Sequence, residues 1–182
     1  NSFFNPDFAI MASGSLRDSA ISFISVSDSR YVDANKFAVA NIFIGKCRNH
    51  PYFRIIAFSS IASLLGSRGQ ACYASSNSSL ELLSLTQNFC GMPTFSIQWG
   101  ASSGGGMAES TVVRKNLERL GMLCLKPATS ISTLLYISQL HSNTLQYNCI
   151  CIVRMNWQKY FEHSHSHEKA FYSEISDHLP IS

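Results

Sequence analysis

The chain has 182 residues, of which 46% are hydrophobic and 14% charged, and its formal net charge is +3. This length allows one domain with a sizeable core and is too short for two ordinary ones, so we expect a single domain over residues 1–182. The small charge without a dense Lys/Arg run does not predict nucleic-acid binding, and no apolar run approaches the roughly 18–20 residues that cross a bilayer.

Predicted strands and helices alternate along the chain. In order they are a strand at 8–12, a helix at 27–44, strands at 53–58 and 94–99 around a helix at 71–89, helices at 112–120 and 128–140, and a strand at 147–153. The strands are short runs of apolar and β-branched residues, and the helices carry apolar residues at three-to-four spacing. This order predicts an α/β fold, a Rossmann-like doubly wound parallel sheet with helices on both faces.

In such folds, ligands bind outside the carboxyl ends of the strands. Three polar or glycine-rich segments follow predicted strands, at residues 13–14, 59–60 and 100–106. We therefore expect the functional residues at one rim of the sheet.

Four side chains have the chemistry that carbonyl reduction requires. Tyr73 can donate a proton, and Ser60, thirteen residues earlier, can hold the substrate oxygen. Lys36 can lower the phenol pKa, which is ordinarily about 10, and Asn77 shares a helix face with Tyr73. Tyr-x-x-x-Asn is also a common structural pair, so the spacing alone leaves a packing role open.

The context of these residues carries a family resemblance. Residues 58–77 read FSSIASLLGSRGQACYASSN, which closely resembles the catalytic segment of ketoreductase domains from modular polyketide synthases and animal-type fatty acid synthases. These domains are relatives of the short-chain dehydrogenase/reductases, most of which have Tyr-x-x-x-Lys. The subgroup has asparagine in place of that lysine and moves the lysine to the preceding helix, where Lys36 lies.

The resemblance implies a reaction and partners. NADPH would reduce a 3-ketoacyl thioester carried on the phosphopantetheine of an acyl carrier protein domain, beside other synthase domains in the cytoplasm. Tyr73 would donate the proton, Ser60 would hold the carbonyl oxygen, and Asn77 would support a proton relay. Lys36 would tune Tyr73 and bind the cofactor ribose.

Further segments extend the resemblance along the chain. Residues 10–14 (IMASG) are similar to a strand end that lies along the cofactor, which implies cofactor contacts from Ala12, Ser13 and Gly14. Residues 96–100 and 105–109 resemble the approach to a substrate lid at about 100–122, with Gly100 and Met107 in it. Leu65 stands where one stereochemical class has tryptophan, and together with Leu16-Arg17-Asp18 it favours the 3R product.

One departure keeps two rival interpretations open. The family begins with a strand and a Gly-rich phosphate-binding turn, and nothing before Phe8 matches it. We therefore expect the carboxyl-terminal portion of a ketoreductase domain, which by itself binds NADPH poorly. A non-catalytic structural remnant in a megasynthase is the first alternative. A dehydrogenase of small alcohols or sugars is disfavoured, because Asn77 replaces the lysine expected there.

Two other patterns suggest metal binding without predicting it. His163, His165 and His167 alternate, as ligands on one face of a strand would. The six cysteines form no Cys-x-x-Cys pair, which is typical of free thiols in a reducing compartment. We expect no metal site.

Overall fold

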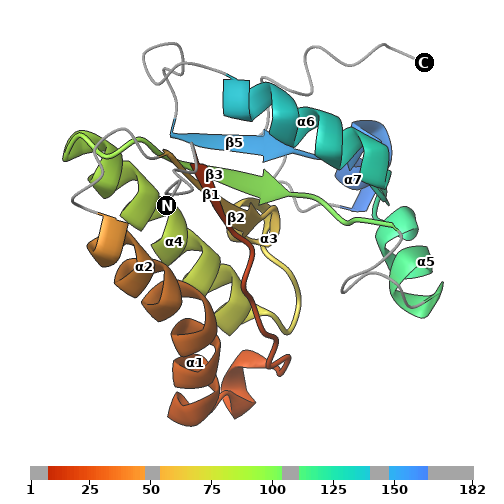
Figure 1. The fold of residues 1–182 in the computed structure, drawn as a ribbon. Coiled ribbons are helices and arrows are strands. Elements are labelled where there is room, and N and C mark those ends of the chain that lie inside the picture. The colour runs from red at the N-terminus through yellow and green to blue at the C-terminus, as the bar shows by residue number, and fades with distance from the viewer. Residues whose placement is uncertain (1–7, 48–53, 104–110, 140–147, 164–182) are drawn as a thin grey trace. The chain divides into compact units, whose positions relative to one another are not determined.

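The computed structural model describes residues 8–47, 54–103, 111–139 and 148–163 (Figure 1). The described chain forms two compact units. The first comprises residues 1–99 and 136–152, and the second comprises residues 100–135 and 153–182. The prediction of a single domain over the whole chain, with a lid at about 100–122, stays a prediction.

The first unit is built on a four-stranded parallel sheet. Its strands are β1 (Phe8–Met11), β2 (Arg54–Ser60), β3 (Thr94–Trp99) and β5 (Cys149–Ile152), in the spatial order β1-β2-β3-β5. The register pairs Ile10 with Ile56 and Ser60 with Trp99. The predicted α/β fold around a parallel sheet is confirmed. Because the strands are parallel, their carboxyl ends meet at one rim, as the sequence predicted.

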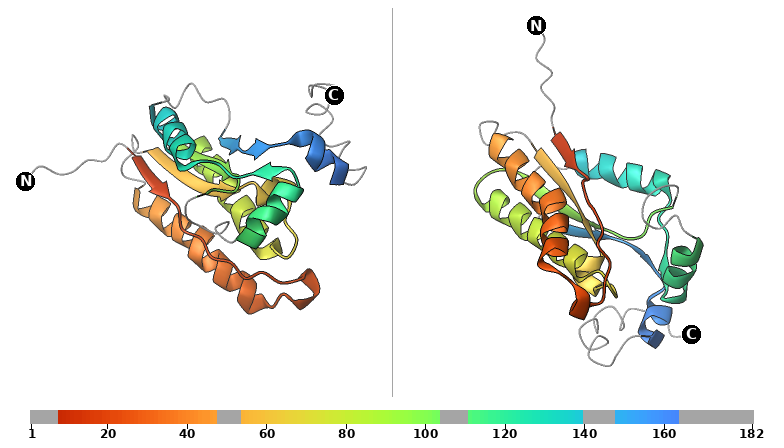
Figure 2. Two further views of the ribbon diagram at one scale, coloured as in Figure 1. Left: turned by 90° about the vertical axis from the view of Figure 1, so that its right-hand side faces the viewer. Right: turned by 90° about the horizontal axis from the view of Figure 1, so that it is seen from below.

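The first unit also holds several helical segments. They are η1 (Ile21–Phe23), α1 (Val26–Asp33), η2 (Ala34–Ala38), α2 (Val39–Cys47), α3 (Ala62–Leu65) and α4 (Ala71–Phe89). The segments α1, η2 and α2 follow each other without a break, and this long helix lies beside α4 (Figures 1 and 2). The helix predicted at 27–44 is therefore present, but its middle turn, η2, is a π-helix.

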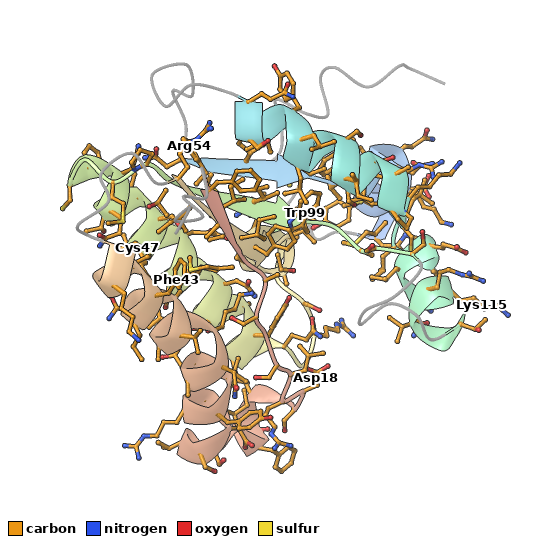
Figure 3. All side chains as sticks on the ribbon, viewed as in Figure 1. Asp18, Phe43, Cys47, Arg54, Trp99 and Lys115 are labelled. Carbon is orange, nitrogen blue, oxygen red and sulfur yellow. The ribbon has the colours of Figure 1, made fainter. Side chains whose placement is uncertain are left out.

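Two apolar clusters join α2, α4 and the sheet. Ala40 of α2, Ala57 of β2 and Leu80 of α4 form one buried cluster. A second cluster joins α2 to β2 through Ile44 and Ile55, and Phe43 and Cys47 pack against it (Figure 3). These contacts fix α2 and α4 against the strands. The side chains that the helices carry near the carboxyl rim of the sheet are therefore held in place.

Helix α4 has the bounds that the sequence predicted, and a glycine ends it. The amide of Met92 donates to the carbonyl of Gln87 at 3.0 Å, and that of Gly91 donates to Asn88 at 3.0 Å. Gly91 has φ of 83°, in the left-handed region that glycine adopts without steric cost. The Schellman pattern stops the helix and turns the chain into β3.

The second unit holds short elements that the sequence analysis did not all find. They are α5 (Thr111–Arg119), β4 (Met122–Leu123), β6 (Arg154–Met155) and α7 (Trp157–His163), and α6 (Pro127–Gln139) crosses the boundary between the units. Strands β4 and β6 pair antiparallel. Two residues are too few to show an alternating pattern, so sequence periodicity could not predict this pair.

The turn before β4 requires a glycine. A Cβ on Gly121 would lie 2.5 Å from the carbonyl oxygen of Asn156, and the residue has φ of 81°. Its carbonyl accepts a hydrogen bond of 2.7 Å from the Asn156 amide. The two chain segments of the second unit therefore meet backbone to backbone here.

Among the helices that the structure describes, none combines the length and hydropathy that crossing a bilayer requires.

Candidate active site

Lys36 is buried in the π-turn, with 4% of its surface exposed. Its Nζ donates to the carbonyl oxygen of Phe58 at 2.7 Å and to that of Ser13 at 3.2 Å. The same nitrogen lies over the ring of Tyr73, 5.7 Å from the ring centroid. The turn thus directs the amine at the carboxyl ends of β1 and β2, and π-turns are frequent at functional sites.

Burial lowers the pKa of Lys36 from 10.5 to about 8, because the charged amine loses its water. The negative charge of Glu81 opposes this effect and raises the pKa. The two carbonyl oxygens at Nζ compensate part of the lost hydration with hydrogen bonds. Lys36 is therefore a cation that can exchange its proton near neutral pH.

Tyr73 and Asn77 lie one turn apart in the first half of α4. Tyr73 is 8% exposed, and Asn77 is fully buried. The Asn77 Nδ2 donates to the Tyr73 carbonyl at 2.8 Å, which fixes the amide orientation. The Asn77 Oδ1 is buried and has no hydrogen-bond partner within the part of the chain that the structure describes. An unpaired buried oxygen is costly, so this atom is suited to accept from a water or ligand.

Ser60 is the last residue of β2. The sequence predicted a strand that ends at residue 58 and placed Ser60 just beyond it, so the observed strand is two residues longer at this end. Its Oγ accepts from the Ala62 amide at 3.2 Å, and Ser60 is buried. The next amide, that of Ile61, donates to the Trp99 carbonyl at 2.9 Å. Trp99 ends β3 (Figure 3). The hydroxyl is thus held at the carboxyl rim of the sheet by its own loop.

The segment after β1 approaches the same lysine. Ala12, Ser13 and Gly14 are exposed, and Ser13 receives the Lys36 hydrogen bond through its carbonyl. A Cβ on Gly14 would lie 3.6 Å from the Lys36 Nζ. Exposed backbone beside a buried amine fits a polar ligand at this rim, such as the ribose hydroxyls of a nucleotide.

The loop that precedes Tyr73 is tied to the segment after β1. The Gln70 Nε2 donates to the Asp18 Oδ2 at 3.1 Å, and the Ser19 amide donates to the Gly69 carbonyl at 2.8 Å. Gly69 has φ of 77°, in the left-handed region. These bonds fix where the chain enters α4, and so they help to set the position of Tyr73.

The structure does not bring all predicted site residues together. Lys36, Tyr73, Asn77, Ser60 and the segment 12–14 belong to the first unit. Leu65 ends α3 and is half-buried, also in the first unit. Gly100 belongs to the second unit, and Met107 lies outside the described residues.

Sequence reasoning missed Glu81, which lies one turn beyond Asn77 on α4. Its Oε1 accepts hydrogen bonds from the hydroxyls of Ser59 and Ser63, on either side of Ser60. The signal was present in the sequence, because positions 73, 77 and 81 share one face of a helix.

Metal ligands do not gather in the described part of the chain, where no group of three or more His, Cys, Asp or Glu side chains could hold an ion. His163 ends α7, and His165 and His167 lie outside the described residues. The prediction that these histidines bind no metal stays a prediction.

Comparison with known proteins gives a consistent result. The KR domain family matches residues 8–104. Polyketide synthase GfsA of Streptomyces halstedii is 28% identical over 151 residues, which are 83% of this chain and 2% of that protein. Mycoketide-CoA synthase of Mycobacterium tuberculosis is 37% identical over 81 residues, which are 42% of this chain and 2% of the synthase.

Solved structures with this fold include ketoreductases. The first ketoreductase of the tylosin PKS superposes with a TM-score of 0.73 at 26% identity, over 85% of this chain and 33% of that one. The A-type ketoreductases from a modular polyketide synthase give 0.76 at 22% identity, over 84% and 31%. The angucycline C-6 ketoreductase LanV, solved with bound NADP, gives 0.67 at 15% identity, over 80% and 60%. The chain thus spans about a third of the first two structures.

Proposed function

The chain belongs to the KR domain family, and from that premise we propose that it reduces a 3-ketoacyl thioester to the 3-hydroxyacyl thioester with NADPH, as part of a polyketide or fatty acid synthase. The observation that carries the proposal is the buried Lys36 amine 5.7 Å from the centre of the Tyr73 ring. Few structural roles require a desolvated lysine against a phenol at the carboxyl rim of a parallel sheet.

The carbonyl oxygen gains negative charge as the ketone is reduced, so donors at that oxygen stabilise the transition state. In this proposal the Ser60 hydroxyl holds the oxygen, and the Tyr73 phenol transfers its proton to it. The Lys36 ammonium favours the phenolate that remains, because opposite charges attract in a site with little water. The alcohol is the product.

Tyr73 must then regain a proton. Lys36, whose pKa is about 8, can supply one near neutral pH, and solvent must replenish it. The Asn77 Oδ1, which has no hydrogen-bond partner among the described residues, supports a route for this step, because it can hold a water that relays a proton to Lys36. Asn77 would thus order the relay.

Part of a nicotinamide site fits the residues present. Lys36 and Tyr73 would bind the ribose, and the exposed backbone of Ala12, Ser13 and Gly14 would line the cofactor. The cofactor supplies the hydride when bound. The preference for NADPH over NADH rests on the family resemblance.

The remaining predictions concern partners. The substrate would be carried by the phosphopantetheine of an acyl carrier protein domain, and neighbouring synthase domains would contact the chain. The polyketide synthases that match support this view, because each is far longer than the matched region. The following features stay predictions: a cytoplasmic location, no nucleic-acid or membrane partner, the 3R product, and the lid contacts of Leu65, Gly100 and Met107.

The test measures NADPH oxidation with a generic 3-ketoacyl thioester, using the protein in its natural sequence context. Tyr73→Phe keeps the ring and removes only the acidic hydroxyl. We expect kcat to fall by about 10²–10⁴-fold, the usual contribution of a general acid. Tyr136→Phe makes the same change at an exposed tyrosine of α6 and should leave kcat unchanged.

Two results would count against the proposal. Activity that survives Tyr73→Phe would refute the assigned acid. No activity in the unsubstituted protein, with NADPH and substrate saturating, would favour the non-catalytic structural remnant.

A further inference from the structure

We propose that Glu81 is a positioning residue: its carboxylate holds the hydroxyls of Ser59 and Ser63, and through them the Ser60 loop, in the geometry that carbonyl reduction requires. This inference rests on the proposed function, since it assigns Ser60 to the substrate oxygen. Its structural part, the fixing of the Ser60 loop, can be tested separately.

Glu81 continues the face of α4 that carries the site. Residues 73, 77 and 81 follow each other at four-residue spacing, so their side chains lie in one row along the helix. The row begins with the buried phenol and amide of Tyr73 and Asn77. Glu81 is half-buried one turn further on. A carboxylate here requires partners, because partial burial removes water from its charge.

The partners of Glu81 flank Ser60. The Oε1 accepts hydrogen bonds from the Ser59 hydroxyl and, at 2.5 Å, from the Ser63 hydroxyl. Hydrogen bonds to an ionised acceptor are the strong ones. The Glu81 Oε1 therefore connects the end of β2, through Ser59, with the following helix α3, through Ser63.

Ser63 extends this connection to Ser60 itself and to β3. Its Oγ lies 2.6 Å from the Ser60 carbonyl oxygen, and it accepts from the Gln98 Nε2 at 3.2 Å. A hydroxyl has one proton, so Ser63 donates to either Glu81 or Ser60 at a time. Donation to Glu81 ties Ser63 to α4, and donation to the Ser60 carbonyl closes the turn on itself. In both cases Ser63 also accepts from Gln98 of β3, so the turn that presents the Ser60 Oγ is restrained.

Positioning of this hydroxyl matters because a donor must lie within a few tenths of an ångström of its productive place. The Ser60 Oγ accepts a hydrogen bond from the Ala62 amide at 3.2 Å. Backbone hydrogen bonds from the Ile61 amide to Trp99 and from the Leu65 amide to Ile61 also hold the turn. The Glu81 network restrains the same turn from its other side.

The charge of Glu81 has a second effect on the site. It raises the pKa of Lys36 and so opposes the effect of burial. Two titratable groups of α4 act on this lysine, and they are Tyr73 and Glu81. From β2 and the segment after β1, Lys36 meets the carbonyl oxygens of Phe58 and Ser13. Burial raises the pKa of the Cys149 and Cys151 thiols of β5, and the negative charge of Glu81 adds to this effect.

The first variant is Glu81→Gln, which keeps the size and one acceptor oxygen but removes the charge. We expect kcat to fall at least tenfold with the KM for NADPH unchanged. The alkaline limb of the kcat profile should move to lower pH, because Lys36 loses the charge that raises its pKa. Glu162→Gln, at an exposed glutamate of α7, is the matched control and should behave as the unsubstituted protein.

The second variant, Ser63→Ala, keeps the test valid if Glu81→Gln does not fold. It should lower kcat severalfold at constant KM, whereas Ser78→Ala, an exposed serine of α4, should not. Glu81→Asp, which keeps the charge on a shorter chain, should restore the pH profile and recover kcat in part.

A readout without turnover separates this inference from the proposed function. Hydrogen exchange at the Ala62 amide, which bonds the Ser60 Oγ, should be at least tenfold faster in Glu81→Gln than in the unsubstituted protein. Exchange at the Ile55 amide, which bonds the Pro93 carbonyl at the other end of β2, should stay the same.

Faster Ala62 exchange supports the inference, even if the unsubstituted protein proves inactive and the proposed function fails. Unchanged exchange together with unchanged kcat in an active protein overturns the inference and leaves the proposed function intact. Unchanged exchange in an inactive protein overturns both.

Discussion

Replacement of Lys36 by methionine should change how the stability of the fold depends on pH. The folded protein loses the Lys36 proton at a pKa of about 8, whereas an unfolded lysine keeps its proton up to 10.5. Between these values the unfolded state binds more protons, so the free energy of unfolding rises with pH. This direction is opposite to that of a lysine stabilised by an ion pair, because here burial disfavours the charged form.

The size of the effect follows from the two pKa values. The drop from 10.5 to about 8 corresponds to about 3 kcal/mol. We therefore expect the stability of the unsubstituted protein to gain about 3 kcal/mol, relative to Lys36→Met, between pH 8 and pH 10.5. Methionine fills much of the same space and carries no proton, so the variant lacks this gain.

The assay is urea unfolding followed by circular dichroism at several pH values across this interval. Lys46→Met, at an exposed lysine near the end of α2, is the matched control and should follow the unsubstituted protein. Ionisable side chains that do not contact Lys36 are common to all three proteins, so their contributions cancel in the differences. Parallel stability curves for Lys36→Met and the unsubstituted protein would refute a desolvated amine at this position.

Two further predictions concern the fold. Gly121→Ala should lower the free energy of unfolding by more than about 2 kcal/mol in urea titration, because the new Cβ meets the Asn156 backbone at 2.5 Å and φ is 81°. Gly45→Ala is its control: a Cβ there meets nothing within 4 Å, so the same assay should give no loss. Ser25→Ala removes the capping box with Asp28 at the start of α1 and should cost about 1 kcal/mol in thermal or urea unfolding, and an unchanged midpoint would contradict that role.

Several elements could be predicted from the sequence because local patterns decide them. Helix α4 and strand β3 have the bounds expected from their composition, since a glycine and a proline separate them. The parallel sheet followed from the alternation of strands and helices, since parallel strands require crossover connections. Tyr73 and Asn77 could be placed on one face from their spacing alone.

Other features depend on contacts between distant residues. The π-turn around Lys36 leaves no local pattern, yet it directs the amine at carbonyls 22 and 23 residues away along the chain. The paired strands β4 and β6 are two residues each and form only because the chain returns at Gly121 and Asn156. Periodicity cannot reveal such elements.

The sequence by itself determined the fold class, the family and which side chains have the chemistry of carbonyl reduction, because these depend on residue type and on spacing within single elements. Only the tertiary structure decided that Lys36 is desolvated against Tyr73 and that Glu81 joins the hydroxyls around Ser60. A pKa shift and a hydrogen-bond network both arise from burial and from the meeting of separate elements, and neither quantity exists until the chain is packed.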